Sequence, residues 1–476
     1  MSPAKAIGRR GVLRSGLAAV AAGALLPLGA RGAAAENWLR LQPRPGTARL
    51  LGGDEPPTAV WSYNQTVPGP EIRVRQGDWL RVLVDNGLAQ DTTVHWHGLR
   101  IPQNMDGVPG LTQPPIRPGE TFRYAFQVPD AGTFWYHPHV RSSEQQGRGL
   151  YGVLIVEEAQ PPPVDRDVTW VIDDWRLDEA GAISESFDNP MDLSHSGRLG
   201  NVATLNGQDS STFAVRAGER LRLRIVNTAN ARIFALRFEG HRPQVIALDG
   251  QPTRPHAPLQ DRLVVPPAGR VDVILDLEGE PGGRYRVMDE FYPRRSYTFL
   301  ELVYDPAPPL RRSPPEAFVG LAPNPIPEPK VAEAQRHEVV LAGGAMGAMG
   351  SAILDGRRLG IRDLVSQGKV WAMNGRVAHG QVMDPLFTFQ RGRTQVLTIR
   401  NRTAFPHPMH LHGHSFRWLS RNGQPVAGAP WLDTVLLLAE EEVEIAFVAD
   451  NPGDWLFHCH VLEHMQAGMS AVVRVS

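Results

Sequence analysis

A pattern of glycine, asparagine and paired histidines occurs twice in the chain at one constant spacing. The residues of the first copy recur 315 positions later: Gly77, Asn86, His95, His97 and Gly98 become Gly392, Asn401, His410, His412 and Gly413. Five matches at one spacing are unexpected by chance in 476 residues. They predict that the chain contains two copies of one domain.

A second set of matches extends both copies, and an incomplete copy lies between them. Gly132, His137 and His139 correspond to Gly453, His458 and His460, and each set includes an aromatic segment before the histidines. In the middle, Gly218 and Asn227 keep the nine-residue interval, but Leu236 and Phe238 replace the first histidine pair and Met288 and Glu290 replace the second. The sequence predicts three homologous domains, the middle one without the histidines.

Short alternating segments indicate that each copy consists of β-strands. Apolar residues alternate with polar ones at 122–128, 221–225, 271–277 and 443–447, as in a sheet with one buried face. The 47 glycines and 42 prolines supply the turns of an all-β protein. We expect Greek-key sandwiches. The predicted domains are 36–160, 161–305 and 331–476, and a proline-rich linker covers 306–330.

The first 35 residues have the features of an export signal. An apolar stretch, 17–30, precedes Ala33-Ala34-Ala35, a suitable cleavage site, and is too short to span a membrane. No acidic residue occurs there, and the basic residues are Lys5, Arg9, Arg10, Arg14 and Arg31. Arg9-Arg10 predicts a twin-arginine signal, with an ordinary secretory signal as the alternative. We expect a periplasmic or secreted protein without a membrane span.

Four short segments, with one residue just after the last of them, carry ten of the sixteen histidines. The segments are His95-Trp-His97, His137-Pro-His139, His407-Pro-Met-His410-Leu-His412 and His458-Cys-His460, and His464 follows. One such pair is more often a solvated or core feature than a metal site. Four pairs at equivalent repeat positions favour metal binding, because residues i and i+2 of a strand point to the same face about 7 Å apart.

Cys459 is the only cysteine, so an intrachain disulfide is excluded. Between His458 and His460 it must point to the opposite face of its strand, which allows one strand to serve two metal sites. Together with His407, His464 and Met469 it forms the ligand set of a blue copper site. Met469 alone would be interpreted as a core residue. A structural zinc site would require a second, closely spaced cysteine.

These segments resemble the signature of the multicopper oxidase family, which includes laccases, bilirubin oxidases and cuprous oxidases. The resemblance spans essentially the whole predicted mature chain and implies three cupredoxin-like Greek-key β-sandwich domains. It implies four copper ions with these ligands: His407, Cys459, His464 and Met469 for type 1; His95 and His410 for type 2; and His97, His137, His139, His412, His458 and His460 for the type 3 pair.

The resemblance also implies a reaction. Electrons from a reducing substrate would pass from the type 1 copper along Cys459 to His458 and His460, and dioxygen would be reduced to water at the other three copper ions. Asp106, nine residues after His97, resembles the acidic residue that supplies protons there, although an Asp-Gly pair also favours a turn. Some bacterial relatives carry a second acid after the last histidine, where this chain has Met465.

We expect a laccase-like oxidase of phenols and aromatic amines that acts as a monomer. The alternative is a cuprous oxidase, since Met346 and Met349 lie in a glycine-rich loop and Met409 and Met465 flank proposed type 1 ligands. A copper nitrite reductase has no use for six type 3 histidines, and copper-free structural relatives lose the ligands. A formal charge of −1 offers no basic field for nucleic acid.

Overall fold

A computed structural model describes residues 38–311, 313, 315–380 and 383–476. The predicted signal peptide lies outside this range. Strands dominate, and the α-helices have five or six residues each: α1 (Ser142–Gly147), α2 (Pro190–Ser194), α3 (Ile361–Val365) and α4 (Leu462–Gln466). The 3-10 turns are η1 (Gln103–Met105), η2 (Leu259–Asp261), η3 (Pro293–Arg295) and η4 (Val331–Glu333). The prediction of an all-β fold is confirmed.

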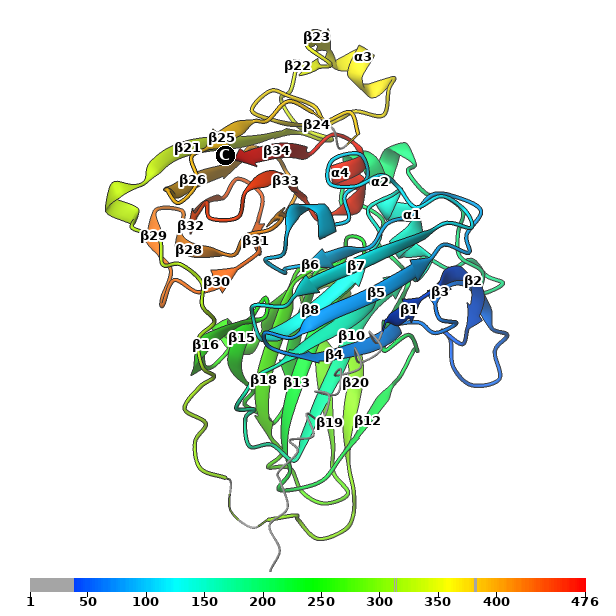
Figure 1. Cartoon of the computed structure of the whole chain (residues 1–476). Coiled ribbons are helices and arrows are strands. Elements are labelled where there is room, and N and C mark those ends of the chain that lie inside the picture. The colour runs from blue at the N-terminus through cyan, green and yellow to red at the C-terminus, as the bar shows by residue number, and fades with distance from the viewer. Residues whose placement is uncertain (1–37, 312, 314, 381–382) are drawn as a thin grey trace, which may run out of the picture. The chain divides into compact units, whose positions relative to one another are not determined.

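The strands divide into three consecutive sets, and every sheet draws on one set only (Figure 1). In the first domain the sheets have the orders β1-β5-β7, β4-β9-β8-β6 and β2-β3. Its strands are β1 (Leu39–Leu41), β2 (Pro43–Ala48), β3 (Thr58–Tyr63), β4 (Gly69–Arg75), β5 (Trp79–Asp85), β6 (His95–His97), β7 (Thr121–Gln127), β8 (Gly132–His137) and β9 (Gly152–Glu157). Alternation places Leu80, Val82 and Val84 in the core.

The middle domain pairs a six-stranded sheet, β11-β10-β13-β18-β15-β16, with a five-stranded sheet, β12-β20-β19-β14-β17. Its strands are β10 (Arg166–Trp175), β11 (Val202–Leu205), β12 (Thr212–Val215), β13 (Arg220–Asn227), β14 (Phe234–Phe238), β15 (Gln244–Leu248), β16 (Gln251–His256), β17 (Leu263–Val265), β18 (Arg270–Asp276), β19 (Arg284–Asp289) and β20 (Tyr297–Tyr304).

Strand β13 departs from the one-face pattern that its alternation predicts, because both of its faces are buried. Leu221, Leu223 and Ile225 enter the core of the middle domain, whereas Arg222 and Arg224 are buried on the other face. The arginines are paired there with acidic residues: Arg222 with Glu158 and Asp272, and Arg224 with Asp167 and Asp272. Polar alternates therefore mark an interface between domains here, since buried charges require partners.

The third domain has two main sheets, β24-β21-β26-β32-β28-β29 with β30 beside β28, and β25-β34-β33-β27-β31; β22-β23 forms a hairpin. Its strands are β21 (Gln335–Gly343), β22 (Ser351–Leu354), β23 (Arg357–Gly360), β24 (Trp371–Met373), β25 (Phe387–Phe389), β26 (Thr394–Asn401), β27 (His407–Leu411), β28 (Phe416–Arg421), β29 (Gln424–Pro425), β30 (Trp431–Leu432), β31 (Thr434–Leu437), β32 (Glu442–Val448), β33 (Gly453–Cys459) and β34 (Ser470–Val475).

The repeated asparagines make the same contacts in all three domains. Asn86, Asn227 and Asn401 are buried at or just after the ends of β5, β13 and β26. The side-chain oxygen of each accepts from the backbone N–H two residues ahead. Each side-chain amide donates to two backbone carbonyls. One turn geometry thus occurs three times, which supports the three-copy interpretation.

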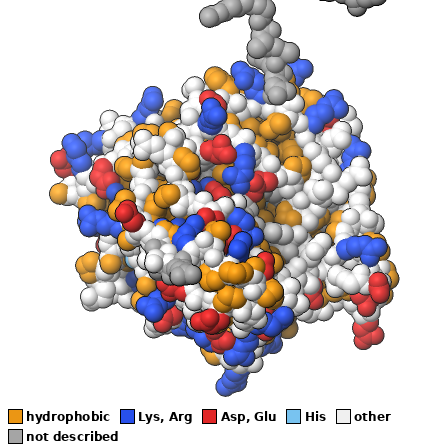
Figure 2. All heavy atoms as spheres, turned by 90° about the horizontal axis from the view of Figure 1, so that it is seen from below, with side chains coloured by type: hydrophobic (Ala, Val, Ile, Leu, Met, Phe, Trp, Pro, Cys, Tyr) orange, Lys and Arg blue, Asp and Glu red, His pale blue; other side chains and the backbone are white. Residues whose placement is uncertain are grey.

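The described part of the predicted linker, 306–311, 313 and 315–330, contains no strand and is hydrogen-bonded to the domains that it passes. Arg220 donates to the Glu316 carbonyl at 2.8 Å, and the Asn324 amide donates to the Ala131 carbonyl at 2.8 Å. On the face shown in Figure 2, basic and acidic side chains are intermixed with hydrophobic ones.

Candidate metal centre

Three of the predicted type 1 ligands meet in the third domain. The Sγ of Cys459 lies 3.5 Å from His407 Nδ1 and 3.7 Å from His464 Nδ1, and the two nitrogens are 3.0 Å apart. Strand β27 supplies His407, β33 supplies Cys459 and α4 supplies His464. We call this group the cysteine cluster.

Burial controls the protonation of the cysteine cluster. It lowers the pKa of His407 well below the usual value and that of His464 to about 3. Both rings are therefore uncharged at neutral pH and can offer a nitrogen lone pair to a metal ion. Burial also raises the pKa of the Cys459 thiol, so a thiolate there requires a bound cation. Met469, the predicted axial ligand, is fully buried, and its backbone bonds to both Cys459 and His464.

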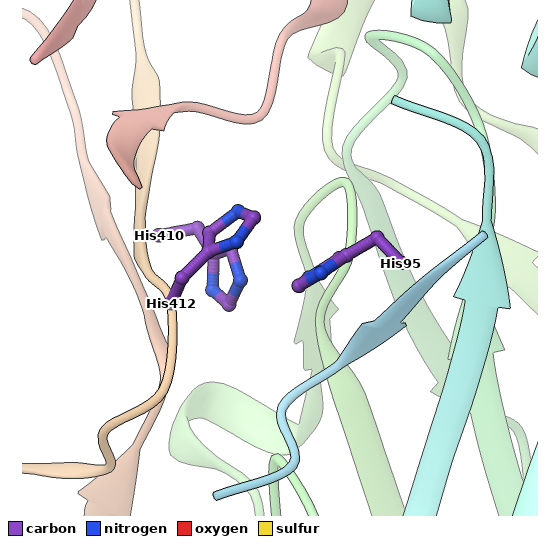
Figure 3. A group of neighbouring side chains, drawn as sticks. All are labelled: His95, His410 and His412. Atoms are coloured by element: carbon purple, nitrogen blue, oxygen red, sulfur yellow. The ribbon is translucent and has the colours of Figure 1, made fainter. Parts of the chain in front are cut away.

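The eight other predicted ligands converge between the first and third domains. They are His95, His97, His137, His139, His410, His412, His458 and His460, all buried, and we call them the eight-histidine cluster. Figure 3 shows His95 facing His410 and His412 across the gap between β6 and β27. The ring of His95 stacks on His412 and that of His97 on His410, with centroids 3.9 and 3.7 Å apart.

Strand pairing explains this convergence. His95 lies opposite His137 in the β6–β8 pair, and His410 lies opposite His458 in the β27–β33 pair. Because alternate residues of a strand share a face, each pairing aligns two His-x-His segments. Potential metal groups form within the cluster around His95, His410 and His412, around His95, His97 and His137, and around His139, His412 and His458. The rings of His97, His137 and His460 also lie together, with centroids within 5.7 Å.

The hydrogen bonds of the rings suit metal binding. One nitrogen donates to a protein oxygen in His95, His97, His137, His410, His412 and His458, which leaves the other nitrogen as a lone-pair donor. Among the described residues, His95 Nε2, His97 Nδ1, His137 Nε2, His410 Nε2 and both His460 nitrogens are buried without a hydrogen-bonding partner. Buried polar atoms left in this way are expected of metal ligands. The donor set therefore fits copper.

Burial also keeps these rings unprotonated. It lowers the pKa of His97, His137, His139, His412, His458 and His460 well below the usual value, and the neighbouring imidazoles lower it further. A neutral imidazole is the form that binds a metal ion.

Asp106, the predicted acid, lies at the edge of the cluster and contacts both domains. It follows η1, and Gly107 comes next in the turn that an Asp-Gly pair favours. Its Oδ2 accepts from His412 Nδ1 at 2.9 Å, and its backbone carbonyl accepts from His95 Nδ1 at 2.8 Å. The turn is therefore present, and the carboxylate reaches the cluster; the role of Asp106 as a proton donor remains a prediction.

A second acidic residue at the cluster, Asp433, was not predicted. Its Oδ1 accepts from His97 Nε2 at 3.1 Å, and its backbone carbonyl accepts from His410 Nδ1 at 2.9 Å. Thr434 lies beside it, with its hydroxyl 3.1 Å from His410 Nδ1. A signal was present in the sequence, because Asp433 and Thr434 are the only polar residues between Pro430 and Leu438. A lone acid in an apolar segment is expected to be buried against a partner.

Glu463 lies on α4, next to His464. It is fully buried, and burial raises its pKa to about 7. Its carboxyl accepts from the Arg198 backbone N–H at 3.0 Å and the Asn230 amide at 3.1 Å, both from the middle domain. Met465 packs in a small apolar group with Val108 and Leu456.

The middle domain also covers the cysteine cluster. His464 Nε2 donates to the His195 carbonyl at 2.6 Å, just after α2. Trp371 lies against the His464 ring with centroids 4.4 Å apart, and its indole donates to the Leu193 carbonyl. The surroundings of His464 are therefore aromatic, and half-buried His195 separates it from solvent.

Comparisons with known proteins agree with this geometry. Residues 46–161, 166–301 and 358–476 each match a family model described as multicopper oxidase. The chain is 31% identical to multicopper oxidase MmcO of Mycobacterium tuberculosis, over 90% of this chain and 85% of that protein. It is 29% identical to Laccase-1 of Botryotinia fuckeliana, over 91% and 80%.

Solved structures show the same likeness. A multicopper oxidase from Pseudomonas thermotolerans superposes with a TM-score of 0.80 at 32% identity, covering 92% of this chain and 99% of that one. A metallo-oxidase from Campylobacter jejuni gives 0.75 at 26%, covering 92% and 90%. The chain belongs to the multicopper oxidase family. It is a copper-dependent oxidoreductase with O2 as acceptor and a cupredoxin-like fold. Within the described residues, none of the helices has the length and apolarity needed to cross a membrane.

Proposed function

We propose that the protein is a laccase-like oxidase that couples one-electron oxidation of phenols or aromatic amines to the reduction of O2 to water. Strand β33 carries the argument, because Cys459 belongs to the cysteine cluster, while His458 and, just after the strand, His460 belong to the eight-histidine cluster. When bound, copper supplies one-electron transfer at the first cluster and oxygen reduction at the second.

The proposed ligands follow the two clusters. His407, Cys459 and His464, with Met469 as axial ligand, would hold one type 1 ion, and the eight histidines would hold three more. His95 and His410 would bind type 2 copper, whose two ligands come from different domains. His139, His412 and His458 would bind one type 3 ion and His97, His137 and His460 the other, consistent with the ring groupings. The total is four copper ions per chain.

The protein supplies orientation, exclusion of water and protons. Carbonyl and carboxylate oxygens hold the ring nitrogens that do not face the metal, and full burial keeps solvent from the cluster. Asp106, hydrogen-bonded to His412, is the group that would deliver protons during oxygen reduction. We further propose export by the twin-arginine route to the periplasm or outside the cell; Arg9→Lys/Arg10→Lys should then block export.

An aromatic reductant is supported by the surroundings of His464. Trp371, Phe405 and His195 form a connected set of rings beside it, with centroid distances of 5.8 Å for Trp371–Phe405 and 5.7 Å for His195–Phe405. A planar ring can stack on half-buried His195, whose carbonyl is bonded to His464.

Oxidation of Cu(I) is the second candidate, and two exposed methionines favour it. Met191 on α2 is 63% exposed and Met346 is 83% exposed. The two segments are joined by a bond from Ala345 N to the Ser194 carbonyl. Met349, by contrast, packs against the buried group around Ala352 and Leu354.

Turnover of a dimethoxyphenol and of Cu(I) tests the substrate. We expect a higher kcat/KM for the phenol, and Met191→Ala/Met346→Ala should leave that value unchanged. Met349→Ala is the matched control. Preferred turnover of Cu(I) that falls in the double variant but not in the control would establish the metal-ion oxidase instead.

A further inference from the structure

Arg270 of the middle domain joins all three domains through one buried guanidinium. It is the first residue of β18, and its side chain is 0% exposed. Nη1 and Nη2 donate to the two carboxylate oxygens of Asp433, at 2.9 and 2.5 Å, and Nε donates to the Thr133 carbonyl at 3.2 Å. Asp433 belongs to the third domain and Thr133 to the first.

The arginine fixes the carboxylate that contacts the eight-histidine cluster. A guanidinium that bonds both oxygens of a carboxylate sets the plane as well as the position of that group. Asp433 Oδ1 is therefore held 3.1 Å from His97 Nε2, which leaves His97 Nδ1 buried and without a hydrogen-bonding partner among the described residues. The same Oδ1 also lies 3.3 Å from Nδ1 of His410, the proposed type 2 ligand, and that nitrogen contacts the Asp433 carbonyl as well.

Gly98, in the motif that follows His97, indicates that this ion pair and the cluster form one packed unit. A Cβ on Gly98 would lie 2.4 Å from Arg270 Nη2 and 2.5 Å from Asp433 Oδ2. In the other copy of the motif, a Cβ on Gly413 would instead meet the ring of Trp455 at 2.5 Å. Gly98 thus leaves space for the Arg270–Asp433 ion pair, whereas Gly413 in the other copy of the motif leaves space for an aromatic ring.

We propose that Arg270 is a positioning residue for copper: through Asp433 it orients His97 and His410, so that the copper-free middle domain controls metal retention at the cluster. This inference rests on the ligand assignment proposed above. Without the guanidinium, the buried Asp433 loses its counter-ion, and its carboxylate is free to turn away from His97. Outer contacts of this kind change metal affinity 10- to 100-fold.

Arg222 provides a matched control. It is also fully buried in the middle domain, and it is paired with Asp272 and Glu158. Among the described residues, neither of these acids has a hydrogen bond to a cluster histidine. Replacement of Arg222 thus tests the loss of a buried interdomain ion pair without the contact to the cluster.

The experiment compares holoenzymes of wild type, Arg270→Lys and Arg222→Lys. Copper is measured during titration with a chelator, type 2 copper by its EPR hyperfine splitting, and type 1 copper by the visible absorption. We expect Arg270→Lys to lose type 2 copper at a chelator concentration at least tenfold lower than wild type, with altered hyperfine splitting and full visible absorption. Arg222→Lys should match wild type.

Two results would overturn the inference. One is type 2 copper of Arg270→Lys that matches Arg222→Lys in retention and hyperfine splitting. The other concerns Asp433→Asn, which is measured if Arg270→Lys does not fold. This variant keeps an oxygen near His97 but removes the charge, and the proposal requires it to lose type 2 copper. Retention by Asp433→Asn at the wild-type level rejects the proposal. Wild type is measured first, because a lack of type 2 copper there would reject the ligand assignment itself.

Discussion

Cys459 and His458 are adjacent residues of β33 that belong to different clusters. Cys459 Sγ lies 3.5 Å from His407 Nδ1, and His458 Nε2 lies 3.1 Å from His412 Nε2. His458 Nδ1 also donates to the Cys459 carbonyl at 2.8 Å. The two proposed copper centres are therefore joined by one peptide unit and one hydrogen bond, the shortest connection that an alternating strand allows.

Asp106→Asn should slow oxygen reduction about 100-fold, as expected for the loss of a general acid. Asparagine keeps an oxygen that can accept from His412 Nδ1, so copper content and visible absorption should be retained. Reoxidation of the reduced enzyme by O2, followed in a stopped-flow instrument, measures the effect. Exposed Asp78→Asn is the control. A reoxidation rate for Asp106→Asn equal to that of Asp78→Asn would remove Asp106 from the mechanism.

Gly98→Ala should destabilise the protein more than Gly77→Ala. Both glycines have φ near +85°, so the backbone strain of alanine, about 1–2 kcal/mol, is common to the two. A Cβ on Gly77 meets nothing within 4 Å, whereas on Gly98 it meets Arg270 and Asp433. We expect a further loss of about 1–3 kcal/mol at Gly98, together with weaker copper retention. Thermal unfolding of both variants measures the difference, and equal midpoints would contradict the packing described here.

Asp249 should make stability depend on pH near neutrality. Burial and the charge of Asp433 raise the pKa of Asp249 to about 7. The folded protein then keeps a proton that the unfolded chain releases near pH 4, so the free energy of unfolding falls as pH rises from about 4 to about 7. This contribution amounts to at most about 4 kcal/mol, and Asp249→Asn should lack it.

Asp249→Asn should therefore gain stability relative to wild type as pH rises from 5 to 8. The difference between the two unfolding midpoints measures this gain. The pKa of Asp433 is shifted in the opposite direction. Burial opposes ionisation of Asp433, but the charge of Arg270 outweighs it and holds the pKa of Asp433 well below the usual value. Its own contribution is lost only as pH falls below about 4. Because Asp433→Asn also removes the charge that helps to raise the pKa of Asp249, this variant should gain stability relative to wild type between pH 5 and pH 8, but less than Asp249→Asn does. A slope of the opposite sign for Asp249→Asn would contradict this account.

The convergence of the proposed ligands could be predicted from sequence because both strand alternation and the repeat are local signals. His-x-His at equivalent positions of two copies is sufficient to place eight rings near one another, and the position of Cys459 between two histidines sets its opposite direction. The all-β fold followed from the same alternation. The domain boundaries, the signal at Arg9-Arg10 and the substrate remain predictions.

The contacts that hold the ligands could not be predicted. Arg270 and Asp433 are 163 residues apart, and their pairing exists only because two domains pack together. The arginines of β13 have the alternation of a solvated face, but they are buried, and Arg222 pairs both with Asp272 of its own domain and with Glu158 of the first domain. His464 is hydrogen-bonded to the backbone carbonyl of His195, and a backbone contact of this kind leaves no pattern of side chains in the sequence.

The most direct test of the central claim is the copper content of the purified chain together with its absorption spectrum, compared with Cys459→Ser. We predict four copper ions per wild-type chain, strong visible absorption from the Cys459 site and a near-ultraviolet shoulder from the type 3 pair. Cys459→Ser should lose the visible absorption and turnover but keep the shoulder. Saturation of wild type at one or two copper ions, or visible absorption that persists in Cys459→Ser, would contradict the claim that β33 joins two copper centres.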